Sequence, residues 1–130
     1  MINFMRVKLL LHKSGEDYLE AILILQKQRE TVRSIDLVHY TGYSKASISH
    51  AVSTLEKCGL LKKDQNKYLK LTPMGKEVAE RIYEKHCVLS ELLIRIGVSQ
   101  KTAQTDACRI EHVISDESFQ KLKEWRKIRL

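Results

Sequence analysis

Three side chains that can bind a transition metal fall within five residues of one another in the segment DACRIEHVISDE: Cys108, Glu111 and His112. On an α-helix, positions i, i+3 and i+4 share one face. A thiolate, a carboxylate and an imidazole directed at one point suit a borderline transition metal. By spacing alone, a buried cysteine beside a surface Glu-His pair is an equally good interpretation.

Two further stretches carry residues of the same chemical types. Asp17 and Glu20 form an acidic pair spaced i, i+3 near the start of a predicted helix, where the helix dipole alone favours acids. His86 lies late in a long predicted helix. Taken singly, each of these residues has an ordinary structural explanation.

The elements that must position these residues begin with three helices. Apolar spacing predicts a helix over 16–29, with Ser14 as a possible cap. A short helix follows Ser34, and Gly42 ends it. Ser44 begins a third helix, which stops at Gly59. Two short helices joined at a tight turn near a glycine indicate a helix-turn-helix.

The next segment predicts a wing. The runs GLLKK and KYLKLT flank the polar residues DQN and indicate two strands joined by a tight turn. Later segments predict helices over about 74–96, from Ser99 to about Ile114, and after Ser115-Asp116. The fold class is therefore mainly α. We expect a winged helix-turn-helix domain at 1–72 and a helical domain at 73–130, whose apolar surface indicates a partner subunit.

Composition agrees with a nucleic-acid partner. The net charge is +7, of which residues 31–72 supply +4 (seven Lys/Arg against three Asp/Glu) and residues 73–130 supply +2 (eleven against nine). Three cysteines make a disulfide framework improbable and favour a reducing cytoplasm. No apolar run reaches the roughly 18 residues of a membrane span, so no membrane association is expected.

The second helix of a helix-turn-helix enters the major groove with its first residues toward the base edges. The candidates for that role are Ser44, Lys45, Ala46, Ser47, Ser49 and His50. For His50, a purely solvent-facing role is an equal alternative. Basic residues outside that segment are expected to bind phosphate: Arg33, Lys57 and, in the wing, Lys67.

The order of elements and four motifs resemble a known family. DACRIEHVISDE, EDYLEAI at 16–22, LTPMGKEVAERI at 71–82 and the KH of 85–86 are similar to the iron- and manganese-dependent repressors typified by the diphtheria toxin repressor and the manganese transport regulator. The resemblance covers roughly residues 14–125. It implies a cytoplasmic homodimer that binds double-stranded operator DNA with Mn(II) or Fe(II) as corepressor.

The resemblance also implies a metal-ligand set. Asp17 and Glu20 match the manganese branch, Cys108 matches the iron branch, and both branches share the residues matched here by His86, Glu111 and His112. The chain is therefore a hybrid, and Zn(II) or Co(II) could also bind in vitro. Ser90 and Gln104 stand where the iron branch has ligands of an ancillary site, so that site is doubtful in its iron-branch form. The 130 residues are too few to include the SH3-like third domain of longer members.

The sequence thus predicts a metal-dependent transcriptional repressor of metal-ion homeostasis that is not an enzyme. One alternative is a metal-independent winged-helix regulator that responds to a small molecule. A second is an enzyme with Cys108 as nucleophile and His112 as base, which ranks low because no oxyanion loop and no third orienting group are visible.

Overall fold

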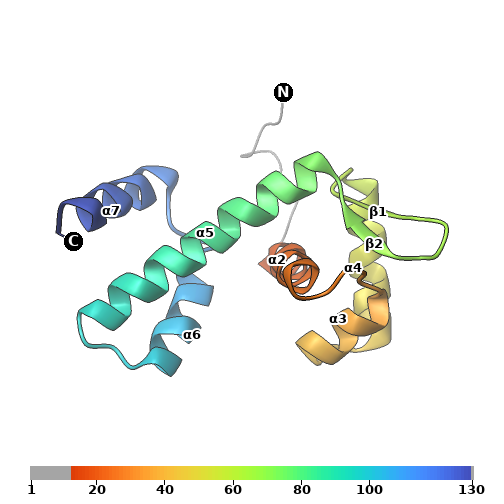
Figure 1. The fold of residues 1–130 in the computed structure, drawn as a ribbon, viewed down its shortest axis with the longest axis horizontal. Helices are drawn as coiled ribbons and strands as arrows, with labels where there is room; N and C mark the ends of the chain where they lie inside the picture. Colours follow the sequence, from red (N-terminus) through yellow and green to blue (C-terminus); the bar gives the residue numbers. More distant parts are fainter. Residues whose placement is uncertain (1–12, 130) are drawn as a thin grey trace. The chain divides into compact units, whose positions relative to one another are not determined.

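The computed structural model describes residues 13–129, and it divides the chain into two compact units. Unit 1 is Met1–Glu80 and unit 2 is Arg81–Leu130, so the division falls inside one helix, α5. Each unit is described by itself below (Figure 1). The domain boundary expected after residue 72 stays a prediction.

Unit 1 contains the predicted helix-turn-helix. Helix α2 (Lys13–Gln28) is followed by α3 (Ser34–Thr41) and α4 (Lys45–Lys57), and all three contact one another. The turn between α3 and α4 forms as expected. Gly42 takes the left-handed conformation with φ 78°, and the Ser44 side chain accepts a hydrogen bond from the Ser47 backbone N–H at the start of α4.

Two expected helix starts are wrong by one turn or less. Helix α2 begins at Lys13, which places Ser14 inside the helix instead of at its cap. Helix α3 takes Arg33 as its N-cap residue in place of Ser34. The physical reason at α3 is Asp36, whose carboxylate accepts a 2.7 Å hydrogen bond from the backbone N–H of Arg33.

The wing is a two-stranded antiparallel sheet, as predicted. Strands β1 (Leu61–Lys63) and β2 (Leu69–Leu71) pair with Leu61 opposite Leu71. At the tip, one Asp64 carboxylate oxygen accepts hydrogen bonds from the backbone N–H groups of Asn66 (2.8 Å) and Tyr68 (3.0 Å). This arrangement closes the turn although Lys67 has φ 65°, a conformation that non-glycine residues seldom adopt.

The core of unit 1 is aliphatic. Its largest fully buried side chains come from α2, α3, α4, β2 and two connecting segments: Leu19, Ile22, Val32, Leu37, Ile48, Val52, Leu55, Leu60 and Leu69. Burial of a Val, Leu or Ile side chain stabilises a fold by about 1.5–3 kcal/mol relative to exposure. The scaffold that carries the helix-turn-helix is therefore held by ordinary hydrophobic packing.

A junction at Thr72 joins the end of α4, the wing and the beginning of α5. The Thr72 hydroxyl donates to the carbonyl of Gly59 (2.7 Å) and accepts from the backbone N–H of Gly75 (3.1 Å). The Thr72 N–H donates to the carbonyl of Leu60 (3.1 Å). A Cβ atom on Gly75 would lie 1.9 Å from the Leu60 carbonyl oxygen, so only glycine fits at this point without a shift.

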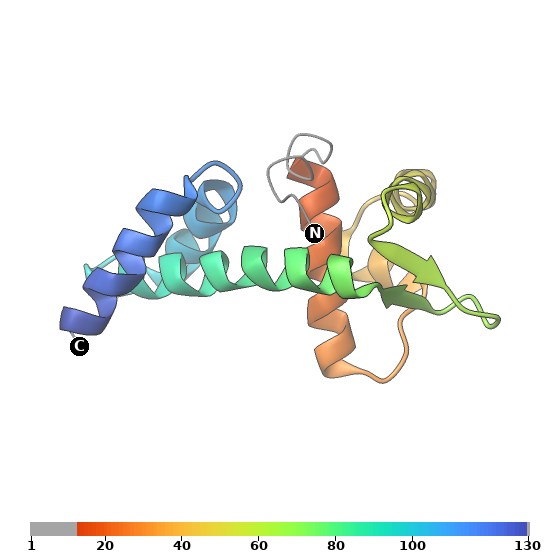
Figure 2. The same cartoon turned by 90° about the horizontal axis from the view of Figure 1, so that it is seen from above.

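Unit 2 takes in the second part of α5 (Pro73–Arg95), together with α6 (Gln100–Ile110) and α7 (Asp116–Arg129). Helix α7 crosses beside the C-terminal part of α5 (Figure 2). Ion pairs connect the two helices: Lys85 with Asp116 (3.2 Å), Arg126 with Glu91 (3.0 Å) and Lys123 with Glu84. The buried apolar residues of this unit include Val88, Leu89, Ala103, Ala107 and Phe119.

One expected boundary in unit 2 is wrong. The helix predicted from Ser99 to about Ile114 ends at Ile110, and the residues from Glu111 to Ile114 form turns. The predicted cap of the last helix is present, since the Ser115 hydroxyl accepts a hydrogen bond from the Ser118 N–H. In the described part of the chain, every helix is too short or too polar to serve as a membrane span.

Candidate metal centre and nucleic-acid interface

Within unit 2, the side chains of Cys108, Glu111 and His112 converge. Each offers one ligand atom, and these atoms all lie within 4.8 Å of one another. The Glu111 side chain is completely buried, and its Oε1 atom lies 3.4 Å from Nε2 of His112. The three residues thus form a compact cluster of thiol, carboxylate and imidazole.

The backbone explains why the three side chains meet although the helix ends early. Cys108 is in the last turn of α6, and Glu111 is the C-cap with φ −57° and ψ −26°, still in the right-handed region. The N–H groups of Val113 and Ile114 both donate to the carbonyl of Ile110. The chain therefore continues to coil in the same hand beyond Ile110 and keeps the helical spacing of the side chains.

Helix α5 adds His86 to this cluster. Its Nδ1 atom lies 3.0 Å from Oε2 of Glu111, within hydrogen-bonding distance. The imidazole is only about a quarter exposed, with 26% of the side-chain surface accessible. The Glu111 carboxylate thus lies between His86, 25 residues earlier in the sequence, and its neighbour His112.

The donor set fits a divalent transition metal. Among the described residues no hydrogen-bond donor is placed on Oε1 of Glu111, although that atom is buried. A buried carboxylate is costly unless it is paired or coordinates a metal. The neighbouring imidazoles and thiol are themselves ligands for Mn(II), Fe(II), Co(II) or Zn(II). The residues present therefore suit a cation at this position.

Asp17 and Glu20 lie on α2 in unit 1, three residues apart and both partly buried. Their spacing places them on the same side of that helix. A role for these two acids in the metal centre belongs to the proposal below.

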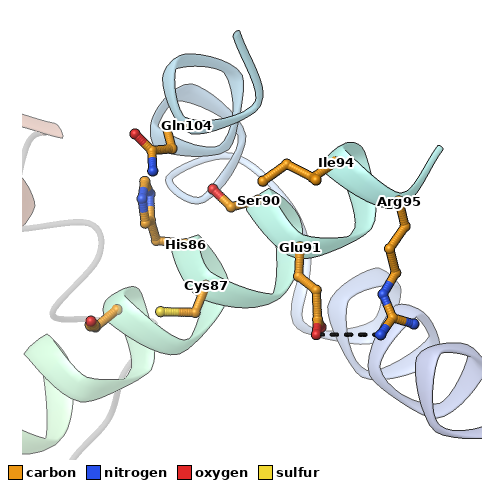
Figure 3. A pocket seen from close by; sticks show the side chains of 8 residues that line it. His86, Cys87, Ser90, Glu91, Ile94, Arg95 and Gln104 are labelled. Atoms are coloured by element: carbon orange, nitrogen blue, oxygen red, sulfur yellow. Dashed lines mark ion pairs between the residues drawn. The ribbon is translucent and has the colours of Figure 1, made fainter. Parts of the chain in front are cut away.

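His86 also lines a pocket of about 550 Å³ (Figure 3). Ser90 and Gln104 both line it, and the Gln104 side chain points toward His86. Glu91, a carboxylate at the same pocket, is paired with Arg95 (3.7 Å) and Arg126 (3.0 Å). Ser90 and Gln104, which stand at the two positions of ancillary ligands in the iron branch, thus line the same pocket. Their hydroxyl and amide groups carry no charge that would offset the charge of a cation.

The predicted DNA-contacting residues all have exposed side chains: Arg33, Ser44, Lys45, Ala46, Ser47, Ser49, His50, Lys57 and Lys67. Six of these occupy the N-cap and first turns of α4. The Ser44 hydroxyl is already engaged with the backbone N–H (3.1 Å) and hydroxyl (3.0 Å) of Ser47. Arg33 lies over the ring of Tyr68, with its guanidinium carbon 4.7 Å from the ring centre.

Two tyrosines beside the turn between α3 and α4 had no role predicted from the sequence. Tyr40 and Tyr43 are large side chains that are 49% and 48% exposed. The available signal was the pair of tyrosines in HYTGYS, which flank Gly42. The Tyr43 ring contacts Tyr18 of α2 edge to face, with 5.6 Å between ring centres.

Two domain profiles of known proteins match the chain, one after the other. Residues 10–69 match the profile of the iron dependent repressor N-terminal DNA binding domain. Residues 72–125 match that of the iron dependent repressor metal binding and dimerisation domain. The first profile covers the helix-turn-helix and the wing as far as the start of β2, and the second covers Cys108, Glu111 and His112.

Individual relatives agree. The chain is 32% identical over 102 residues to the HTH-type transcriptional regulator MntR of Geobacillus kaustophilus, covering 78% of this chain and 72% of that protein. It is also 32% identical over 108 residues to the iron-dependent repressor IdeR of Mycobacterium leprae, covering 82% of this chain but only 47% of the relative. The solved structure of the manganese regulator SloR shares the fold, with TM-score 0.79 at 24% identity over 87% of this chain and 53% of that one.

The chain therefore belongs to the family of iron- and manganese-dependent transcriptional repressors. Membership favours a metal-dependent regulator over the metal-independent alternative. It also assigns unit 1 to DNA binding and the following helices to metal binding and dimerisation. The chain spans about half the length of IdeR and of the SloR structure.

Proposed function

We propose that this protein represses genes of metal-ion homeostasis in the cytoplasm, with Mn(II) or Fe(II) as its corepressor and a two-fold symmetric operator as its target. The observation that supports the proposal best is the fully buried Glu111 carboxylate beside Cys108, His112 and His86. A cation bound there would supply positive charge beside a buried carboxylate.

The proposed ligand set is completed by Asp17 and Glu20, carried over from the manganese branch of the family. These two acids come from α2, which packs against the helix-turn-helix. If both bind the metal with the unit 2 ligands, occupancy and DNA binding favour each other, because the coupling free energy between two sites is reciprocal. His86, Cys108, Glu111 and His112 would bind metal directly.

The metal preference depends on two opposing features of the set. Carboxylates favour Mn(II), whereas the Cys108 thiolate favours Fe(II), Co(II) or Zn(II). Zn(II) should bind well in vitro because affinity rises along the Irving–Williams series. Cys108 and His112 are proposed here as ligands, with no role as nucleophile and base and no enzymatic activity.

For DNA, the exposed residues Lys45, Ala46, Ser49 and His50 of α4 are proposed to reach base edges in the major groove. Ser44, the N-cap, and Ser47, which donates to it, would direct the N-terminus of the helix at the duplex. Arg33, Lys57 and Lys67 are proposed phosphate contacts. A homodimer would present two such helices to two half-sites.

The test measures binding to the promoter region of the protein's own gene, with fluorescence anisotropy as the readout and under anaerobic conditions. We expect Mn(II) or Fe(II) to raise operator affinity over that in chelator, and His112→Ala to abolish the rise. His39→Ala changes an exposed histidine on α3 and is the matched control for metal binding. Equal operator affinity with metal and with chelator would refute the proposal.

A further inference from the structure

The contact between Tyr18 and Tyr43 joins two elements that the proposed function treats separately. Tyr18 lies on α2 and is 6% exposed, whereas Tyr43 lies in the turn between α3 and α4 and is 48% exposed. Their ring centres are 5.6 Å apart and the ring planes meet at 69°. This is the edge-to-face arrangement that aromatic pairs prefer.

On one side, the contact reaches the start of the DNA-recognition helix. Tyr43 directly precedes Ser44, the N-cap of α4. Its backbone N–H donates to the Thr41 hydroxyl (3.2 Å), and the Gly42 N–H donates to the carbonyl of Val38 (2.9 Å). The turn is thereby fixed, so the position of the Tyr43 ring and the entry of the chain into α4 are linked.

On the other side, the contact reaches the acids of α2. Tyr18 follows Asp17 directly, and its pKa is raised first by burial and then by the nearby Tyr43 and the Asp17 carboxylate. Tyr40 of α3 has its pKa raised first by burial and then by the Glu20 carboxylate. Asp17 thus acts on Tyr18, a member of the pair, and Glu20 acts on Tyr40 of α3.

We propose that Tyr18 and Tyr43 are positioning residues that transmit the state of Asp17 and Glu20 to the N-terminus of α4. The inference rests on the proposed function, in which these two acids bind metal. With both acids held, α2 keeps one orientation, and the buried Tyr18 ring then holds Tyr43 and Ser44 in the arrangement that fits the major groove. Without that constraint, α2 and the attached tyrosine contact become more variable.

The experiment measures the operator affinity of the whole protein with Mn(II) and with chelator. The quantity compared between variants is the ratio of the affinity with Mn(II) to the affinity with chelator. Tyr43→Ala should lower that ratio about 2- to 10-fold, the range that one aromatic pair supports. Tyr18→Leu, which keeps apolar bulk, should do the same, and the double variant should be no worse than either single one. Tyr43→Phe keeps the ring and should retain the wild-type ratio.

Two controls separate this coupling from simpler effects. Tyr68→Leu removes an aromatic ring on the wing, next to Arg33, and should change operator affinity equally in both states, leaving the ratio unaltered. In metal-free protein, a double-mutant cycle on thermal unfolding with Tyr18→Leu and Tyr43→Ala should reveal a non-additive term from the ring contact itself.

The outcomes distinguish the coupling from the function on which it rests. Loss of affinity by the same factor with and without metal would make Tyr43 a direct DNA contact and overturn the coupling. Additive effects of the two substitutions on the ratio would also overturn it. A wild-type ratio of one would overturn the proposed function, whereas a metal-responsive wild type with unchanged variant ratios would reject the coupling alone.

Discussion

The two units differ in what occupies their interiors. Nine of the ten largest fully buried side chains among the described residues are aliphatic and belong to unit 1, whereas the tenth is the Glu111 carboxylate of unit 2. Ion pairs also link α5 with α7 in unit 2. Unit 1 is therefore stabilised by hydrophobic burial, whereas unit 2 has a buried carboxylate that a cation can stabilise.

The largest expected effect concerns the apolar interior. Leu55→Ala in α4, a residue only 1% exposed, should lower the free energy of unfolding by about 2–5 kcal/mol, because the cavity adds to the lost transfer free energy. The loss should be the same with metal and with chelator when measured by chemical denaturation. A loss that vanished on adding metal would break the distinction between the units.

Glu111→Gln tests the interior of unit 2. The variant keeps the side-chain volume but removes the buried charge, so metal affinity should fall by at least the roughly 10- to 100-fold that loss of a ligand's outer partner costs. Wild-type protein should gain about 2.7 kcal/mol of stability at metal concentrations 100 times Kd, and the variant should lose this gain.

Without metal, the same substitution should leave the melting temperature unchanged or raise it, because it removes a buried charge whose Oε1 atom has no hydrogen-bond donor among the described residues. Calorimetric melting in chelator and in Mn(II) makes the comparison. Glu117→Gln, which alters an exposed acid in the first turn of α7, is the matched control. A large drop in the melting temperature of metal-free Glu111→Gln would show that the carboxylate stabilises unit 2 without a cation.

A smaller effect is expected at the wing. Lys67→Ala removes an exposed cation at the tip, so the slope of log operator affinity against log salt should become shallower by about 0.9, the contribution of one phosphate contact. Affinity should fall similarly for operator and unrelated DNA. Titrations at several salt concentrations measure the slope, and an unaltered slope would place Lys67 away from the backbone of the duplex.

The smallest effect concerns the turn of the wing. Partial desolvation raises the pKa of Asp64, but the backbone N–H groups of Tyr68 and Asn66 and the Lys70 ammonium outweigh it, so the pKa lies below its usual 3.8. The stabilisation is therefore present above that value and is lost as the pH falls through the lowered pKa.

The amide chemical shifts of Asn66 and Tyr68 should report this loss in an acid titration by NMR. Asp64→Asn should remove the dependence on pH, and resonances elsewhere in unit 1 should stay constant over the same range. Simultaneous change throughout unit 1 would mean that acid unfolds the whole unit instead of opening the wing turn.

Much of the fold was predictable because the signals were local. Gly42 and Ser44 marked the turn of the helix-turn-helix, and GLLKK with KYLKLT marked the wing. The end of α6 was not predictable, since the residues after Ile110 include neither glycine nor proline and keep helical spacing. Neither was the N-cap of α3, where the Asp36 side chain makes Arg33 the cap instead of Ser34.

For the candidate site, i, i+3 and i+4 spacing allowed Cys108, Glu111 and His112 to lie together, as they do, but a surface Glu-His pair was an equally good interpretation of the same spacing. The approach of His86 to Glu111 depends on how α5 packs beside the end of α6, which no local pattern specifies. Only the family resemblance suggested it. The Tyr18–Tyr43 contact had no sequence signal beyond two aromatic residues, because pairing across helices is decided by tertiary packing.

The hydrogen bonds at Thr72 have a consequence for operator choice. They fasten the loop after α4 to the base of the wing and so fix the distance between them. If α4 lies in the major groove and the wing binds a nearby phosphate, the spacing between these two contacts is fixed as well. Moving a favoured base by one step, about 3.4 Å along the duplex, would misalign both contacts together. Thr72→Val, which removes the hydroxyl at nearly constant volume, should make the protein more tolerant of such shifted sites.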